Sequence, residues 1–148
     1  MVETSNELDS VMSRASEFES DLVVEVDVAI EEFRLGKPLI IVDDEGRENE
    51  GDVCFPADVV SPELINFMAV YARGLICVAM TGERLDELSL PLMTSLNTAP
   101  LGTAFTVSVE AAEGVTTGIS AADRARTVEV LVDPRAGPED LTQPGHMF

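Results

Sequence analysis

The chain has 148 residues, of which 45% are hydrophobic and 25% are charged, as is typical of one globular domain. Its 28 acidic residues outnumber its 9 basic ones and give a net charge of −19, so it lacks the basic surface that nucleic-acid binding requires. The longest apolar stretch, residues 65–80, is interrupted by Arg73 and Gly74, which excludes a membrane-spanning helix there.

The two cysteines, Cys54 and Cys77, lie in apolar contexts and lack the spacing of a zinc site. We predict that both are buried, reduced and structural. The polar, acidic start MVETSNELDS shows no signal-peptide pattern. We therefore expect a cytoplasmic protein.

The chain is expected to form one domain behind a short tail. Residues 1–17 are rich in Ser and Glu without periodicity, a composition typical of a flexible tail. Residues 18–148 contain alternating helix and strand patterns with no linker-like break, so they are predicted to be a single domain.

The first predicted elements are a helix and two strands. Apolar residues recur at helical spacing over residues 21–34, and Gly36 is placed to end this helix. The continuous apolar run PLIIV at residues 38–42 predicts a strand in the middle of a sheet. Residues 52–57 predict a second strand.

The middle of the chain is predicted to hold two helices and a third strand. Ser61 and Pro62 are typical of a helix start, and this helix is expected to run to about Ala72. Residues 75–80, LICVAM, predict a strand, and residues 81–88 a short capped helix.

The last part is predicted to begin with a strand. Alternating apolar and polar residues over 104–111 indicate a strand with one wetter face. Ser120 and Asp123 are typical of the start of a helix that ends before Pro134, and residues 138–141 predict a helical turn. Mixed helices and strands in one core give an α/β (α+β) fold class.

The acidic stretch DDEGRENEGD, residues 43–52, follows directly on the predicted core strand. Composition favours an exposed loop whose charges are solvated. The alternative is a ligand site, in which Arg47 meets an anion and Glu48 a Mg²⁺ ion, which favours carboxylate oxygens.

Two further segments carry candidate chemistry. The run GVTTGISAADR, residues 114–124, offers hydroxyl and N–H groups at a helix start, which suits phosphate, although an ordinary capped loop has the same pattern. His146, the only histidine, is the side chain type that most readily exchanges a proton near neutral pH, although it is equally compatible with a structural role.

Several long runs together resemble the 3,4-dihydroxy-2-butanone 4-phosphate synthase family of riboflavin biosynthesis. They are IVDDEGRENEGDVCFPA, ARGLICVAMT, LPLM, GTAFTVSVEAAEGVTTGISAADRART and QPGHMF. The resemblance implies a lyase that converts D-ribulose 5-phosphate to 3,4-dihydroxy-2-butanone 4-phosphate and formate through a metal-stabilised enediolate. It also implies Mg²⁺ or Mn²⁺ as cofactor and a homodimer with active sites at the subunit interface. The implied fold is a three-layer α/β/α sandwich, with a mixed sheet and helices packed on both faces.

The resemblance also implies roles for individual residues. Those matching catalytic positions are Asp43, Glu48 and His146. Those matching substrate contacts are Arg47, Glu48, Asp52, Thr117 and Arg124. Glu48 would also bind the metal ion.

The family pattern continues beyond the position of Phe148, with a GGHTEA-like motif whose histidine is the second metal ligand. The resemblance therefore implies a C-terminally shortened domain in which Glu48 holds the metal weakly. Gln143 also stands where the family commonly has arginine.

Three hypotheses remain open from the sequence. The favoured one is the family lyase, with its remaining part supplied from elsewhere. The second is a shortened paralogue with different, possibly metal-independent chemistry on another small carbonyl or sugar-derived substrate. The third is a non-catalytic partner subunit, against which the intact motifs count.

Overall fold

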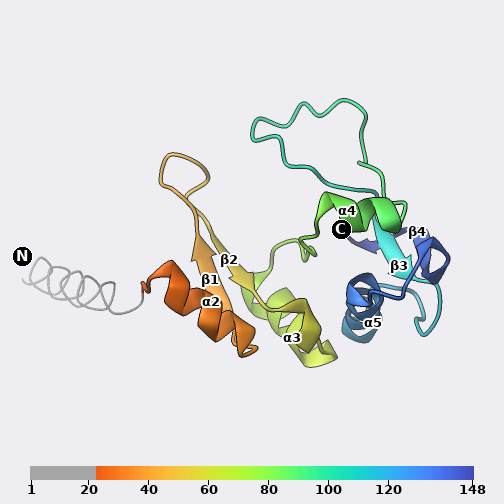
Figure 1. Cartoon of the computed structure of the whole chain (residues 1–148), viewed down its shortest axis with the longest axis horizontal. Coiled ribbons are helices and arrows are strands. Elements are labelled where there is room, and N and C mark those ends of the chain that lie inside the picture. The colour runs from red at the N-terminus through yellow and green to blue at the C-terminus, as the bar shows by residue number, and fades with distance from the viewer. Residues whose placement is uncertain (1–22) are drawn as a thin grey trace, which may run out of the picture.

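The computed structural model describes residues 23–148, in which helices alternate with small antiparallel sheets (Figure 1). The helices are α2 (Val26–Arg34), α3 (Pro62–Phe67), α4 (Gly82–Glu87) and α5 (Ala121–Val132). The strands are β1 (Leu39–Val42), β2 (Gly51–Cys54), β3 (Val109–Ala111) and β4 (Leu141–Met147). Short 3₁₀ turns lie at Ala57–Val59 and Pro138–Asp140, and a π-helical turn at Met68–Ala72 follows α3. This confirms the α/β class, whereas the predicted tail, residues 1–17, lies outside the described residues.

The first two strands form an antiparallel hairpin beside α2 at one end of the molecule (Figure 1). Leu39 lies opposite Cys54, and Val42 lies opposite Gly51. Both predicted strands are confirmed, but the predicted central, buried position of β1 is wrong for the described chain. No third described strand pairs with β1, so its side chains meet solvent and Ile40 is 71% exposed.

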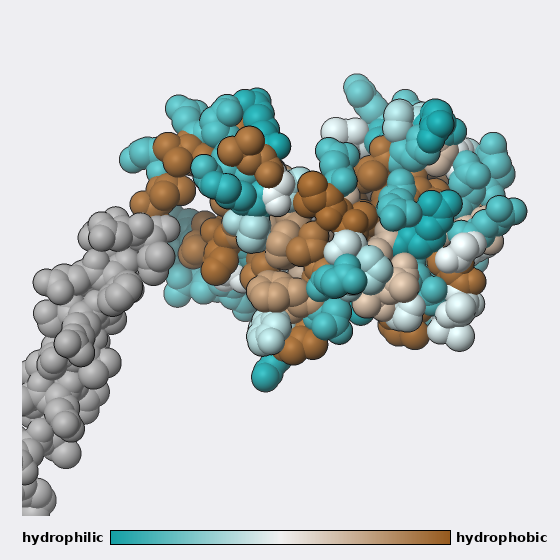
Figure 2. Space-filling model, turned by 90° about the horizontal axis from the view of Figure 1, so that it is seen from below, coloured by the Kyte–Doolittle hydropathy of each residue, from teal (hydrophilic) through white to brown (hydrophobic). Residues whose placement is uncertain are grey.

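The surface of this part of the molecule is correspondingly apolar. Helix α2 buries none of its residues, and apolar side chains reach the surface in Figure 2. The helix nevertheless ends as predicted, because Gly36 adopts a φ of +82° and its N–H donates to the Phe33 carbonyl.

The hydrophobic core lies where α5 packs against the β3–β4 pair and α3. Its largest fully buried apolar side chains are Leu88, Leu131 and Met147. The buried Thr127 hydroxyl ties α5 to β3, because it accepts from the Ala111 N–H (3.1 Å) and donates to the Asp123 carbonyl (3.0 Å). The helix that carries the candidate phosphate segment is therefore fixed to the strand that precedes that segment.

The predicted starts of three helices are confirmed by their side-chain caps. Ser61 accepts a hydrogen bond from the N–H three residues later at the start of α3, and Pro62 occupies the first helical position. Thr81 caps α4, and Ser120 caps α5, in the same way. The helix that begins at Pro62 also reaches Ala72 as predicted, with its last five residues in a π-helical turn.

Two strand predictions need correction. Residues 75–80 form no strand, and one backbone bond outside the regular elements, from the Val78 N–H to the Phe148 carbonyl (2.8 Å), ties them to the end of the chain. The strand predicted over residues 104–111 is shortened to Val109–Ala111. A strand exists only where a partner presents a ladder of carbonyl and N–H groups, and apolar alternation alone does not supply one.

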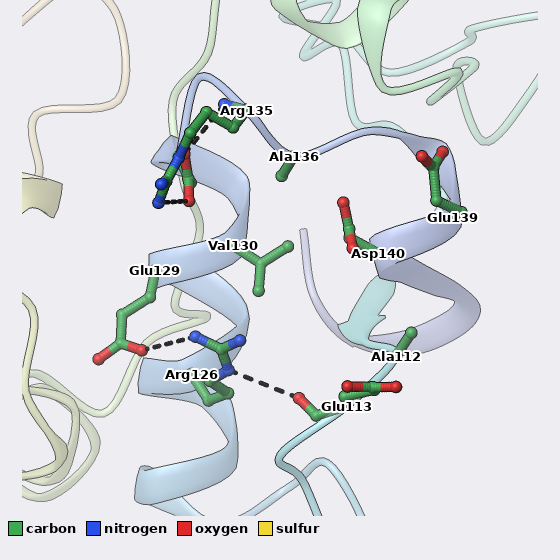
Figure 3. A pocket seen from close by; sticks show the side chains of 10 residues that line it. Ala112, Glu113, Arg126, Glu129, Val130, Arg135, Ala136, Glu139 and Asp140 are labelled. Carbon is green, nitrogen blue, oxygen red and sulfur yellow. Dashed lines mark hydrogen bonds and ion pairs between the residues drawn. The ribbon is translucent and has the colours of Figure 1, made fainter.

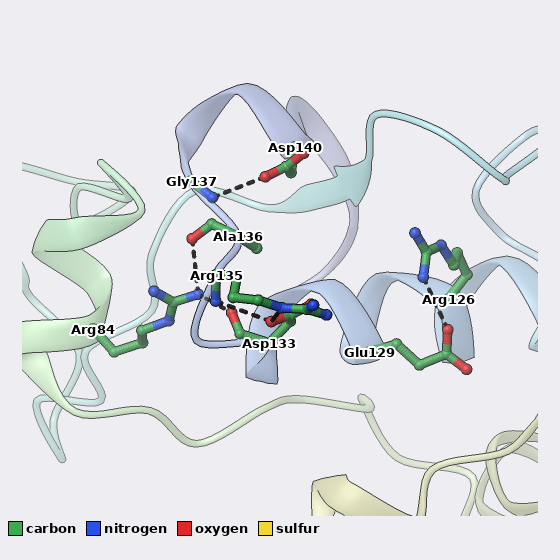
Figure 4. A network of polar contacts seen from close by, with 8 residues as sticks. All are labelled: Arg84, Arg126, Glu129, Asp133, Arg135, Ala136, Gly137 and Asp140. Atoms are coloured by element: carbon green, nitrogen blue, oxygen red, sulfur yellow. Dashed lines mark hydrogen bonds and ion pairs between the residues drawn. The ribbon is translucent and has the colours of Figure 1, made fainter.

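Arg84 of α4 closes the end of α5 (Figure 4). Its guanidinium donates to the carbonyls of Leu131 (3.4 Å), Asp133 (2.7 Å) and Ala136 (3.1 Å). These acceptors include C-terminal carbonyls that lack partners within the helix. None of the helices in residues 23–148 has the length and apolar character to cross a membrane.

Candidate functional site

The predicted acidic loop connects β1 to β2 and is organised by Asp43. The Asp43 carboxylate accepts hydrogen bonds from the backbone N–H groups of Glu48 and Glu50 and from the Arg47 guanidinium, each at 2.9 Å. The backbone bonds to Glu50 and Glu48, more than the Arg47 charge, hold the pKa of Asp43 below its ordinary value. Asp43 therefore stays ionised and gives the loop a defined shape.

Arg47 and Glu48 lie on the same side of this loop. The Arg47 guanidinium is 2.9 Å from Asp43 and 3.4 Å from the Glu48 carboxylate, so one group bridges both acids. The Glu48 side chain is 35% exposed and Arg47 is 52% exposed, which leaves both open to a ligand. These adjacent side chains approach each other because the backbone turns at residues 45–48.

Asp52 lies on β2, opposite Ile41, and is exposed. It is also close enough to both cysteines for its charge to act on them. Partial desolvation of the sulfur by neighbouring atoms, followed by the Asp52 charge, raises the pKa of the Cys77 thiol and of the Cys54 thiol, although the Cys77 residue as a whole is exposed. Both thiols therefore stay protonated.

The prediction that both cysteines are buried is wrong. Cys77 is exposed and Cys54 is half-buried, because the strand predicted over residues 75–80 does not form and leaves Cys77 without a covering layer. Sequence reasoning missed that the charge of Asp52 acts on Cys77. No sequence pattern indicated it, because Asp52 lies on β2 and Cys77 lies in an irregular segment.

His146 lies on β4 and is paired with a residue that the sequence analysis did not single out. Its Nδ1 contacts the Glu110 carboxylate of β3. An ionised carboxylate only accepts hydrogen bonds, so this contact suits the tautomer in which Nδ1 carries the proton and Nε2 is an acceptor. Glu110 is 17% exposed and His146 42%, so the ring faces solvent while its partner is sheltered. The alternation over residues 104–111 had already placed Glu110 on the wetter face.

The β3–β4 pairing brings these two residues together. Val109 lies opposite Met147, and the register shifts between Val109 and Glu110. The Gly145 N–H donates to the Ser108 carbonyl (3.1 Å), and a Cβ at Gly145 would overlap the Val109 backbone. A glycine is therefore required at this position of the PGH motif for the two strands to approach.

The GVTTG turn is folded around Asp123 of α5. The Asp123 carboxylate accepts from the Thr116 N–H (3.1 Å), the Thr116 hydroxyl (2.8 Å) and the Gly118 N–H (3.0 Å). Asp123 is only 4% exposed. The Thr116 hydroxyl first, and then the other donors, hold the pKa of Asp123 below its ordinary value.

We expect Asp123→Asn to make the stability of the protein less dependent on pH in acid. Because the pKa of Asp123 is lower in the folded state, its contribution is complete above its ordinary value of 3.8 and is lost as the pH falls through the folded value. The parent should therefore exceed the variant in urea midpoint at neutral pH, and the difference should narrow below about pH 3.8. A difference that stays constant from neutral pH down to about pH 2 would contradict this assignment.

The remaining predicted site residues lie in the same region as Asp123. Thr117 is exposed in the GVTTG turn, and Arg124 is half-buried in the first turn of α5. The Arg124 Nε is buried and has no hydrogen-bond partner in the described part of the chain.

The predicted site residues fall into two groups that one chain does not bring together. Asp43, Arg47, Glu48 and Asp52 lie on the β1–β2 hairpin, whereas His146 lies on β4, and Figure 1 shows these parts well apart. Over residues 23–148 there is also no group of three or more His, Cys, Asp or Glu side chains arranged to hold a metal ion. Within residues 23–148 the predicted residues therefore do not form a single site.

A cavity of about 400 Å³ beside α5 is separate from both groups (Figure 3). Arg126 is paired with Glu129 (3.1 Å) and Arg135 with Asp133 (2.8 Å). The other charged residues that line the cavity are Glu113, Glu139 and Asp140. This excess of negative charge makes the cavity unsuitable for a phosphate.

Comparison with known proteins gives a consistent result. A sequence profile of the family described as 3,4-dihydroxy-2-butanone 4-phosphate synthase matches residues 27–148. The riboflavin biosynthesis protein RibBA of Synechocystis is 59% identical over 125 residues, which are 83% of this chain and 22% of the relative. The 3,4-dihydroxy-2-butanone 4-phosphate synthase of Agrobacterium fabrum is 56% identical over 126 residues, which are 85% of this chain and 59% of the relative.

A solved structure supports the same relationship. The crystal structure of a 3,4-dihydroxy-2-butanone 4-phosphate synthase in complex with two magnesium ions superposes with a TM-score of 0.82 and 42% identity. The superposition covers 85% of this chain and 59% of that one. The chain thus spans between 22% and 59% of the length of these three proteins.

Proposed function

Because the chain belongs to the 3,4-dihydroxy-2-butanone 4-phosphate synthase family, we propose that it contributes to the carbon–carbon lyase reaction of riboflavin biosynthesis. The substrate is D-ribulose 5-phosphate, and the products are 3,4-dihydroxy-2-butanone 4-phosphate and formate. The family lyase was the favoured hypothesis from the sequence. The high identity to proteins named as this synthase supports it.

The observation that carries this proposal is the His146–Glu110 pair. Cleavage of a ketose phosphate begins with removal of a proton from carbon, which requires a positioned base. A Glu110 carboxylate that accepts from Nδ1 of His146 leaves Nε2 to take a proton from a substrate. We assign His146 the role of catalytic acid and base.

The acidic loop supplies the substrate-binding groups. We assign substrate contacts to the exposed Arg47, Glu48 and Asp52, because a polyhydroxylated phosphate needs both hydrogen-bond acceptors and a cation. Asp43 is proposed as a catalytic carboxylate of the same loop, and its bonds to the loop backbone keep it in place. Thr117 and Arg124 are proposed as substrate contacts from the α5 side.

The donor set fits a hard divalent cation bound through few protein ligands. Glu48 and Asp52 offer exposed carboxylate oxygens, and Mg²⁺ commonly uses one or two carboxylates with water and substrate oxygens. We propose that Glu48 holds Mg²⁺ or Mn²⁺ weakly, and the bound cation would supply positive charge beside the substrate oxygens. The relative solved with two magnesium ions supports this choice.

We propose a homodimer with the active site between subunits. The acidic loop and His146 lie apart in one chain, and a second copy offers a way to place the loop of one subunit beside His146 of the other. We also retain the cytoplasmic location as a prediction. The free thiols of Cys54 and Cys77 are compatible with it.

Formate release tests the proposal. The chain is incubated with Mg²⁺ and D-ribulose 5-phosphate, alone and with the portion of the Agrobacterium fabrum synthase that lies outside the matched segment. We expect formate in at least one preparation. Absence of formate from both would reject the lyase assignment and favour different chemistry or a non-catalytic role.

A further inference from the structure

The Glu110 side chain lies between two glycines that come from separate segments. A Cβ placed on Gly118, in the GVTTG turn, would overlap the Glu110 carboxyl group. A Cβ placed on Gly145, beside His146, would overlap the Glu110 Cγ. Because neither glycine has a side chain, the space between Gly118 and Gly145 forms a slot, and the Glu110 side chain fills it.

The Gly118 side of this slot is held in place by α5. Gly118 is buried, has a φ of +81°, and donates its N–H to the Asp123 carboxylate. Asp123 also holds Thr116 through two hydrogen bonds, and it is itself fixed by the capped first turn of α5. The position of Gly118 is thus set by α5 and not by β3, which carries Glu110.

The slot restricts the motion of the carboxylate that contacts His146. A glutamate side chain has three rotatable bonds, so a carboxylate in open solvent would spend much of its time away from the imidazole. Confinement between Gly118 and Gly145 keeps the carboxylate on Nδ1. The hydrogen bond made by one ring nitrogen decides which nitrogen carries the proton.

We propose that Gly118 and Asp123 are positioning residues for His146. They confine Glu110, and Glu110 fixes the Nδ1-protonated tautomer and the orientation of the ring. The link to catalysis rests on the role proposed above for His146. The alternative is that Gly118 is a glycine only because its φ is positive.

The single histidine allows a direct test by ¹⁵N NMR of the substrate-free protein, at a pH at which the ring is neutral. In the parent, Nδ1 should carry the proton. In Gly118→Ala the new methyl group should displace the carboxylate, because this is the flexible end of a side chain and yields more readily than backbone. We expect most molecules to change to the Nε2-protonated form that neutral imidazole favours in water.

Two further variants separate the slot from backbone strain. Gly102 has a φ of +67°, and a Cβ added there would meet no atom within 4 Å. Gly102→Ala therefore carries the same kind of backbone strain and should leave the tautomer unchanged. Glu110→Gln provides the reference spectrum for a ring without its carboxylate. The proposal is overturned if Gly118→Ala keeps the parent tautomer, or if Gly102→Ala shifts it equally.

If Gly118→Ala does not fold, Asp123→Asn provides the test. Loss of the carboxylate should release the turn and shift the tautomer in the same direction, and an unchanged tautomer would overturn the proposal. The measurement needs no substrate. A tautomer that responds as expected in a protein without lyase activity would therefore reject the proposed function while leaving the positioning role intact.

Discussion

Replacing His146 with glutamine is expected to reduce formate release by about 10²–10⁴-fold, the usual contribution of a general acid or base. Glutamine keeps a polar side chain of similar length but takes up no proton near neutral pH. The His146 side chain is 42% exposed, so the change should cost little stability. Formate release under saturating D-ribulose 5-phosphate is the measurement.

The control for this variant is a measurement of its stability against urea. The urea midpoint of His146→Gln should stay close to that of the parent, because the buried strand neighbour Met147 keeps its place in the core. A variant that folds normally and releases formate at the parent rate would show that His146 is not the acid or base. In that case the base must come from the acidic loop.

Replacing Glu48 with glutamine is expected to remove cation binding at the acidic loop and to reduce formate release by at least about 10²-fold. The neutral amide is a weaker ligand for a hard cation than a carboxylate. Mn²⁺ binding, followed by electron paramagnetic resonance, should weaken by about 10²-fold or more, since loss of an outer-shell partner alone costs up to this amount. Both measurements are made on the same preparation.

Glu45 provides the matched control for Glu48. It lies in the same loop and is exposed, so Glu45→Gln removes the same charge from the same region. If Glu45→Gln weakens Mn²⁺ binding as much as Glu48→Gln does, the effect is one of total charge and not of a ligand. Unchanged formate release in Glu48→Gln would rule out a cation at this residue as part of the reaction.

The same two variants together test the interface. If each site combines the loop of one subunit with His146 of the other, mixed dimers of Glu48→Gln and His146→Gln contain one intact site. Equal mixing with subunit exchange should then restore about a quarter of the parent activity. No restoration, with exchange demonstrated, would place each site within one subunit.

Local sequence signals predicted the capped starts of three helices and the end of α2 well, whereas α2 begins at Val26 and not at the predicted residue 21. Ser61, Thr81 and Ser120 cap α3, α4 and α5 as expected, and Gly36 follows the end of α2 with a positive φ. Each of these features depends on contacts within about one helical turn. The groups that form each cap are close together in the sequence, so the cap can be predicted without knowledge of the remaining fold.

Predictions that depended on distant partners were less successful. Residues 75–80 have the composition of a strand but form none, and β1 has the composition of a central strand but pairs on one side only. Whether an apolar run becomes a buried strand depends on the chain segments that flank it in space. The exposed position of Cys77 follows from the same cause.

The sequence by itself determined the family, the capped starts of three helices and the residues that carry the proposed chemistry, because motifs and caps are local in the chain. The tertiary structure decided that Glu110 pairs with His146 and that this pair lies apart from the acidic loop. It also decided that Gly118 and Asp123 belong to the surroundings of His146. These relationships join β3, β4 and α5 across 36 residues of chain, and only the strand register and the packing of the helix bring them into contact.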